Sequence, residues 1–247
     1  MNELTGKRAL VTGGSRGIGA AIALALAEKG ADVALTYEHA ADKAAGVVKA
    51  IENKGRRGFA IQADSADAAA VTRSVNEAVS SLGGLDILVN NAGIARSGSL
   101  PEMSLEEIDA LLNINIRAVI LASQAAIPHL KQGGRIISTG SCLAERVPMA
   151  GVTVYSLTKS ALLAFTRGLA RDLGPQAITV NLVQPGPIDT DMNPAANGDF
   201  AEGNRKQTSL GHYGKPDDIA DAVAFLASAA ANYITGTALT VDGGSNA

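Results

Sequence analysis

Tyr155 and Lys159 stand four residues apart in the stretch VYSLTKSALLAF, residues 154–165. Residues at positions i and i+4 of a helix share one face, with Cβ atoms about 5–6 Å apart. An ordinary tyrosine, with a pKa near ~10, is a poor acid–base catalyst at neutral pH, but a neighbouring ammonium lowers that pKa. The pair could therefore move a proton to or from an alcohol oxygen. A solvated lysine beside an exposed tyrosine has the same spacing, so the rest of the chain must decide.

A glycine-rich segment near the N-terminus has the features of a dinucleotide-binding turn. An apolar run leads into TGGSRGIG, residues 12–19, and an alanine-rich helical stretch follows at once. Gly13 permits a tight turn, Gly17 lets the backbone approach a pyrophosphate, and Gly19 allows close packing of helix on strand. Free N–H groups and the helix dipole then favour a diphosphate. The context predicts a dinucleotide site rather than an ordinary strand-to-helix turn.

The elements that must position these residues alternate regularly along the chain. Continuous apolar runs, typical of strands buried on both faces, occur at 8–13, 32–37, 58–63, 85–91, 134–140, 178–186 and 238–243. Alanine-rich helical stretches lie at 17–29, 40–54, 67–82, 104–131, 155–173 and 216–228. This alternation predicts an α/β fold of the Rossmann type, a doubly wound, seven-stranded parallel sheet flanked by helices.

Local signals support the helix boundaries and the domain organisation. Ser104 followed by Glu107 resembles a capping box, and Pro216 suits a first helical turn. The stretch 187–214 is rich in Asn, Gly and Asp and lacks clear periodicity, and a loop of that length is usually functional. Because the alternation is otherwise unbroken, we expect one catalytic domain over residues 1–247 with a substrate loop at 187–214.

Composition argues against several classes of protein. Hydrophobic residues make up 47% of the chain and charged residues 18%, which suits a large core. The net charge is −3 and the basic residues are scattered, so we expect no binding to nucleic acid or to a membrane. The single cysteine, Cys142, excludes an internal disulfide and is expected to be an inert, buried thiol. No signal peptide, uninterrupted apolar run of membrane-spanning length or metal-site histidine spacing is visible, which predicts a soluble cytoplasmic protein without a metal.

Five segments together resemble the short-chain dehydrogenase/reductase family in order and spacing, from residue 8 to residue 243. They are the TGxxxGxG loop, NNAG at 90–93, Ser141, YSLTK at 155–159 and PGPIDT at 185–190. Within the family the chain is similar to the 3-oxoacyl-carrier-protein-reductase type. The stretch VQPGPIDTDMNPA is also similar to a small branch of biofilm-dispersal mediators that bind cyclic dinucleotides.

The resemblance implies a catalytic set with one role for each residue. Ser141 would donate a hydrogen bond to the substrate carbonyl oxygen, and Tyr155 would be the general acid in reduction and the general base in oxidation. Lys159 would hold the nicotinamide ribose and lower the tyrosine pKa. Asn115, rather than Asn113, would anchor a water that leads protons to the lysine.

The resemblance also implies the contacts of a nicotinamide dinucleotide. Asp64 would contact the adenine ring, Asn91 and Gly93 would lie beneath the adenosine ribose, and the segment 185–190 would hold the nicotinamide carboxamide. The complete expected set is Gly13, Ser15, Arg16, Gly17, Ile18, Gly19, Tyr37, Asp64, Asn91, Gly93, Tyr155, Lys159, Pro185, Gly186, Ile188 and Thr190.

The end of the second predicted strand bears on the choice between NADP and NAD. NAD-preferring enzymes usually place a carboxylate there, about 20 residues after the glycine loop, to bond the ribose 2′-hydroxyl. Thr36 and Tyr37 carry no carboxylate, and Arg16 could pair with a 2′-phosphate. Glu38, one residue further along, is the counter-argument. NADP is the expected cofactor.

The expected substrate is a small molecule that carries a ketone, an aldehyde or an alcohol. The predicted pocket walls, Cys142–Glu145 and Val147–Val154, are mostly apolar, whereas Gln176 stands where carrier-dependent relatives tend to be basic. A free carbonyl compound is therefore at least as well supported as an acyl-carrier thioester. The alternative is a nucleotide-binding regulator of the same fold, a sensor of cyclic dinucleotides, for which an intact catalytic set would be unnecessary. The helices 104–131 and 155–173 resemble those that join family members into homotetramers.

Overall fold

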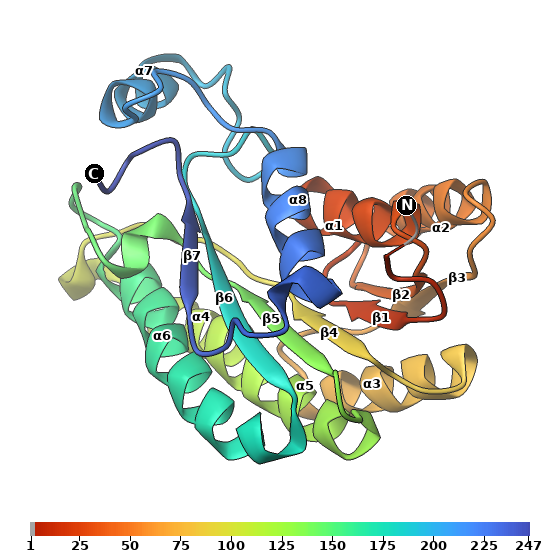
Figure 1. Ribbon diagram of the computed structural model, residues 1–247. Coiled ribbons are helices and arrows are strands. Elements are labelled where there is room, and N and C mark those ends of the chain that lie inside the picture. Colours follow the sequence, from red (N-terminus) through yellow and green to blue (C-terminus); the bar gives the residue numbers. More distant parts are fainter. Residues whose placement is uncertain (1–2) are drawn as a thin grey trace.

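Seven parallel strands form one sheet at the centre of the structure, a computed structural model that describes residues 3–247 (Figure 1). The strands are β1 (Arg8–Val11), β2 (Asp32–Tyr37), β3 (Gly58–Gln62), β4 (Ile87–Asn90), β5 (Arg135–Thr139), β6 (Thr179–Pro185) and β7 (Ala238–Val241). Their order is β3-β2-β1-β4-β5-β6-β7. The order reverses between β1 and β4, where a doubly wound sheet opens a crevice at the carboxyl ends of its strands. The predicted seven-stranded parallel sheet of the Rossmann type is confirmed.

Helices cover both faces of the sheet because its strands are apolar on both sides (Figure 1). On one face lie α1 (Gly17–Glu28), α2 (Ala41–Glu52) and α8 (Pro216–Ala227). On the other lie α3 (Ala68–Leu82), α4 (Leu105–Leu112), α5 (Ala118–Ala126) and α6 (Thr153–Leu173). Each layer buries its own apolar cluster against the sheet, so the described chain folds as a single domain.

The expected helix at 104–131 is interrupted. The capping box of Ser104 and Glu107 starts α4 as predicted, but a π-helical turn at Asn113–Arg117 separates α4 from α5. A short 3₁₀ turn, Ile127–His129, ends the run. The apolar periodicity of the sequence continues through the π-helical turn, because one wider turn changes the register without removing apolar residues.

The predicted loop at 187–214 contains a helix, α7 (Gly198–Gln207), so that part of the prediction is wrong. Its sequence, GDFAEGNRKQ, is polar and buries little, which left no apolar stripe to identify. Figure 1 shows α7 away from the sheet and its two helical layers, on the side where β6 ends and near the C-terminus. A helix in this place can cover an opening at the carboxyl ends of the strands.

One helical run, Leu105–His129, is long and apolar enough to cross a membrane by length and composition alone. It packs beside the sheet through α5, and 39% of its most apolar 18-residue window is buried within the described chain. A core helix passes such a test as readily as a membrane helix, so the run is explained by its place in the helical layer.

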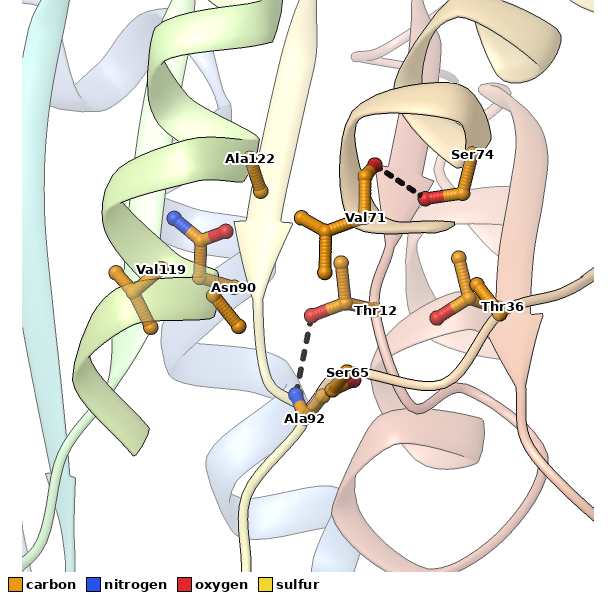
Figure 2. A pocket seen from close by; sticks show the side chains of 11 residues that line it. Thr12, Thr36, Ser65, Val71, Ser74, Asn90, Ala92, Val119 and Ala122 are labelled. Atoms are coloured by element: carbon orange, nitrogen blue, oxygen red, sulfur yellow. Dashed lines mark hydrogen bonds between the residues drawn. The ribbon is translucent and has the colours of Figure 1, made fainter. Parts of the chain in front are cut away.

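A small cavity of about 10 Å³ lies between β1, β2 and β4 on one side and α3 and α5 on the other (Figure 2). Asn90 lines it, is 3% exposed and donates from Nδ2 to Ser123 Oγ at 3.1 Å. Its Oδ1 has no hydrogen-bond partner within residues 3–247, and Figure 2 shows it directed toward Val71. The cavity is about large enough for one water, which would satisfy this oxygen.

We expect Asn90→Ala to lower the free energy of unfolding by about 1–3 kcal/mol, because it removes the buried link between β4 and α5 and leaves Ser123 unpaired. Urea denaturation followed by circular dichroism measures the change. Asn76→Ala, at an exposed position of α3, is the matched control and should stay within about 0.5 kcal/mol of wild type. Equal effects of the two substitutions would contradict a structural role for the Asn90 amide.

Candidate active site

A groove with a volume of about 870 Å³ runs along the carboxyl ends of the strands. It begins beside the end of β2, passes the glycine loop and the ends of β4 and β5, and finishes beneath α7. Sixteen of the residues singled out from the sequence line it: Gly13, Ser15, Arg16, Gly17, Ile18, Gly19, Tyr37, Asn91, Gly93, Ser141, Tyr155, Lys159, Pro185, Gly186, Ile188 and Thr190. They come from six separate segments of the chain and meet along one groove.

The glycine loop is held against the end of β4 by a compact set of hydrogen bonds. The Thr12 hydroxyl accepts from the backbone N–H groups of Asn91 and Ala92, at 3.0 Å each. The Asn91 side chain donates in return to the Thr12 and Gly13 carbonyls at 3.0 and 3.1 Å. Gly13 has φ +64°, and a Cβ on Gly19 would lie 2.2 Å from the Gly13 oxygen. Only glycine at these two positions permits the turn that aims the α1 N-terminus into the groove.

Tyr155 and Lys159 lie on the same face of α6, near its start, and both line the groove. Lys159 Nζ is 5.8 Å from the centroid of the Tyr155 ring and donates to the Thr139 carbonyl at 3.1 Å. The lysine is only 6% exposed and makes no ion pair with a described carboxylate. The i, i+4 spacing therefore places both side chains in the groove rather than on an open helix surface.

Burial shifts the pKa values of both side chains. Desolvation of the ammonium lowers the pKa of Lys159 to about 8. Desolvation also raises the pKa of Tyr155, and hydrogen bonding with Ser141 opposes that rise. Lys159 is not among the causes of this shift, so the expected lowering of the tyrosine pKa by the lysine is not seen in this structure. The phenol therefore stays protonated and is ready to act as an acid.

Asn115 lies in the π-helical turn and is 1% exposed. Its Oδ1 accepts from Ile94 N–H at 2.9 Å, and its Nδ2 donates to the Ile94 carbonyl at 2.9 Å and to Thr158 Oγ1 at 3.1 Å. The Thr158 hydroxyl donates to the Tyr155 carbonyl at 2.7 Å. Asn115 does not line the groove; it joins the segment after β4 to the turn of α6 that carries Tyr155.

Ser141 follows β5 and reaches the site from the other side. Its hydroxyl lines the groove and accepts from the Leu143 N–H at 3.1 Å, so it also caps the short turn Cys142–Ala144. Its hydroxyl hydrogen remains available to a substrate oxygen. The Cys142 thiol is buried, which raises its pKa to about 11 and matches the expected inert cysteine.

The adenosine end of the groove differs in part from expectation. Asp64 is exposed and does not line the groove: its Oδ1 accepts from Ala66 N–H at 2.7 Å, while Ala63 and Ser65 on either side do line it. The Glu38 carboxylate lies 2.8 Å from His39 Nε2. Glu38 also lines the groove, so the carboxylate that is the counter-argument to NADP lies at this end.

Two groove residues at this end were missed by the sequence analysis. Lys43, in the first turn of α2, and Asp191, next to Thr190, both line the groove and lie 3.1 Å apart. Arg16 lies 3.4 Å from the same carboxylate oxygen. No local motif joins positions 43 and 191. Asp191 directly follows Thr190, which was already assigned to the groove, whereas Lys43 had no such signal.

The opposite end of the groove is lined mostly by apolar side chains. Met149 lies before α6, Met192 lies before α7, and Phe200 lies on α7; all three line the groove. Asn204 of α7 donates to the Tyr213 hydroxyl at 2.7 Å, and that hydroxyl donates to Asn193 at 3.1 Å. The polar chain fixes α7 over this end of the groove.

Comparisons with known proteins agree with the geometry. A family model described as Enoyl-(Acyl carrier protein) reductase matches residues 13–246. The chain belongs to the short-chain dehydrogenase/reductase family and is an NAD(P)-dependent oxidoreductase by class.

Three relatives cover nearly the whole chain. A short-chain dehydrogenase from Burkholderia cenocepacia J2315, solved in complex with NADP, is 60% identical with a TM-score of 0.98, over 99% of this chain and 100% of that one. The cyclic-di-GMP-binding biofilm dispersal mediator protein of Escherichia coli K12 is 44% identical over 98% of each chain. The 3-oxoacyl-[acyl-carrier-protein] reductase FabG of Staphylococcus aureus is 44% identical over 96% of this chain and 97% of the relative.

We expect Lys159→Met to change the pH dependence of stability. The folded pKa of Lys159, about 8, lies below its ordinary value of 10.5, so the unfolded chain binds more protons between these pH values. Stability of the wild type should therefore rise with pH in that window, and the methionine variant should lose this rise, which is on the order of 3 kcal/mol. Urea denaturation between pH 7 and 10.5 measures the difference.

Lys49→Met, on the exposed side of α2, is the control and should leave the wild-type pH profile unchanged. Parallel profiles for wild type and Lys159→Met would show that the Lys159 ammonium is not desolvated.

Proposed function

We propose that the protein transfers hydride between NADP(H) and a small carbonyl or alcohol compound, with Tyr155 as general acid/base. The observation that carries the proposal is the convergence of Ser141, Tyr155 and Lys159 on the groove that the glycine loop opens. When bound, the reduced nicotinamide supplies the hydride. The protein supplies orientation, a hydrogen bond to the reacting oxygen and the proton.

The side chains divide the proton chemistry between them. The Ser141 hydroxyl donates to the substrate carbonyl oxygen and polarises it, while the Tyr155 phenol, protonated because its pKa is raised, donates its proton to the same oxygen in reduction. Lys159, whose Nζ is 5.8 Å from the centroid of the Tyr155 ring, positions the ribose of the nicotinamide half. In oxidation the roles reverse, and the phenolate accepts the proton of the alcohol.

Asn115 does not line the groove and acts through the residues that it contacts. Its side chain is fully engaged with Ile94 and Thr158, so in this geometry it positions the backbone around Lys159. We propose that the π-helical turn it stabilises holds the water through which Lys159 exchanges protons with solvent. This keeps the expected role of Asn115 and assigns the water contact to the turn rather than to the amide.

NADP is the proposed cofactor, with the groove-lining set as its contacts. The Burkholderia cenocepacia relative was solved with NADP. In this chain β2 ends at Tyr37 without a carboxylate, Glu38 pairs with His39, and Arg16 reaches the same end of the groove. A 2′-phosphate would therefore meet the Arg16 cation and no carboxylate within β2, while Glu38, the next residue, contacts His39. The backbone beside Asp64 is the proposed floor under the adenine.

The substrate is proposed to bind beneath α7, the helix of the segment 187–214. Met149, Met192 and Phe200 make this end apolar, and Asn204 and Gln207 add polar groups at its rim. An apolar carbonyl compound fits such a lining. Because the lining is mostly apolar here, we favour a free ketone, aldehyde or alcohol over a carrier-bound thioester, with Arg96 as the nearby cation of the groove.

A second function, a sensor of cyclic dinucleotides, is favoured by one observation, the similarity to the Escherichia coli biofilm dispersal mediator. The complete catalytic set around the groove argues for an enzyme, since a pure binder needs no acid beside a buried lysine. We further propose a soluble cytoplasmic protein that binds neither nucleic acid nor membrane. Its net charge of −3 supports this.

We expect Tyr155→Phe to lower kcat/KM for ketone reduction at least about a thousandfold while NADPH still binds, because only the proton donor is lost. Spectrophotometric oxidation of NADPH with a panel of activated ketones measures kcat/KM. The same assay with NADH measures the cofactor preference. Tyr233→Phe is the matched control, since Tyr233 is fully exposed on a distant surface. If wild type and Tyr155→Phe are equally inert on a broad panel while a cyclic dinucleotide raises Tm, the sensor function replaces the enzyme.

We propose a homotetramer built through α4, α5 and α6. These neighbouring helices expose Leu105, Ile120 and Leu157, which are 72%, 43% and 53% exposed. Such side chains on one helical layer are typical of a surface that a second copy covers.

We expect Leu157→Glu to reduce the assembly to dimers or monomers, because a charge would be buried at the proposed contact. Size-exclusion chromatography with light scattering measures the mass. Leu210→Glu, at an exposed leucine of the segment after α7, should leave the mass unchanged. A wild-type protein that is monomeric at micromolar concentration would contradict the tetramer.

A further inference from the structure

Three charged residues from distant parts of the chain meet across the adenosine end of the groove. Arg16 belongs to the glycine loop, Lys43 to the first turn of α2, and Asp191 to the segment after β6. Asp191 Oδ2 accepts from Lys43 Nζ at 3.1 Å and from Arg16 Nη1 at 3.4 Å. The same carboxylate oxygen thus joins two cations that line opposite sides of one opening.

All three side chains remain open to solvent, with exposed fractions of 58–60%. An ion pair at such a surface adds little to the stability of a fold. Its exposed geometry instead leaves both cations able to exchange one anion for another. The two ion pairs lower the pKa of the Asp191 carboxyl, with the hydrogen bond from Lys43 as the main cause, so the residue is an anion at neutral pH.

We infer that Lys43 and Arg16 together bind the 2′-phosphate of NADP(H), and that Asp191 is an internal anion which this phosphate displaces. The inference rests on the proposed function and adds Lys43 and Asp191 as specificity-determining residues. A phosphate offers three acceptor oxygens and about two negative charges, whereas the aspartate offers one charge. The phosphate is therefore the stronger partner for two converging cations.

The neighbouring charges make the exchange selective. Among the ion pairs of residues 3–247, Arg16 and Lys43 both pair with Asp191 and with no other carboxylate. Glu38 pairs with His39 instead, at 2.8 Å. A 2′-phosphate beside an unmoved Asp191 would be repelled by it, and the carboxylate must give way. NAD(H) lacks the 2′-phosphate and shares with NADP(H) only the diphosphate that binds at the glycine loop, so Asp191 can keep its place when NAD(H) binds. Asp191 thereby opposes the binding of NADP(H) and leaves NAD(H) unaffected.

The test measures binding of 2′,5′-ADP and of 5′-AMP by isothermal titration calorimetry, without any reaction. Lys43→Gln should weaken 2′,5′-ADP by about tenfold, the effect of one lost charge-assisted hydrogen bond. Asp191→Asn should tighten 2′,5′-ADP by about threefold, since a competing surface ion pair is removed. Binding of 5′-AMP should change less than about twofold in both variants. In the double variant, the gain from Asp191→Asn should shrink, because one of its two partners is gone.

Two matched controls accompany the variants. Lys49→Gln removes an exposed lysine of the same helix, and Glu202→Gln removes an exposed carboxylate of α7 that pairs with Arg205. Both should bind 2′,5′-ADP as the wild type does. Equal effects of Lys43→Gln on 2′,5′-ADP and 5′-AMP, or weaker 2′,5′-ADP binding by Asp191→Asn, would overturn the inference while the proposed function stands. A wild type that binds neither 2′,5′-ADP nor NADPH would overturn both.

Discussion

A buried ammonium group with a single backbone partner is the constraint on which the site depends. Lys159 is 6% exposed, and its Nζ has only the Thr139 carbonyl as a hydrogen-bond partner among the described residues. Burial of a cation without a counterion is costly, and folding tolerates it only where the surroundings fix the side chain. Gly93 provides that room: a Cβ there would lie 3.4 Å from Lys159 Nζ and 3.2 Å from Asn115 Oδ1. The glycine at position 93, the π-helical turn and Lys159 therefore depend on one another.

The sequence was sufficient for the sheet but not for every helix. Strands β1, β2 and β4 are continuous apolar runs buried on both faces, and the edge strands β3 and β7 are recognisable by the same pattern although they are partly exposed. The π-helical turn at Asn113–Arg117 leaves no such pattern, because it is stabilised by a tertiary contact, the hydrogen bonds of Asn115 with Ile94. Likewise α7 is held by the Asn204–Tyr213 contact rather than by an apolar face. Periodicity cannot reveal an element whose stability comes from a distant polar partner.

The same distinction separates the predicted site residues from the missed ones. The glycine loop, NNAG and Tyr155–Lys159 are local motifs, and their chemistry follows from spacing within a few residues. Lys43 and Asp191 are 148 positions apart, and the fold alone brings them together. Asp64 shows the converse: its position at the end of β3 agreed with a family pattern, yet its side chain turns outward to bond Ala66 N–H. Spacing fixes the place of a backbone more securely than the direction of a side chain.

The segment after β6 connects both ends of the groove. Thr190 lies against the glycine loop, where a Cβ on Gly17 would be 3.5 Å from its methyl group, and Asp191 next to it reaches the cations of the adenosine end. Two residues further on, Asn193 accepts from the Tyr213 hydroxyl, which also holds α7 above the substrate end. The segment 190–193 therefore contacts the glycine loop and the adenosine-end cations at its start and, through Tyr213, supports α7 at its end.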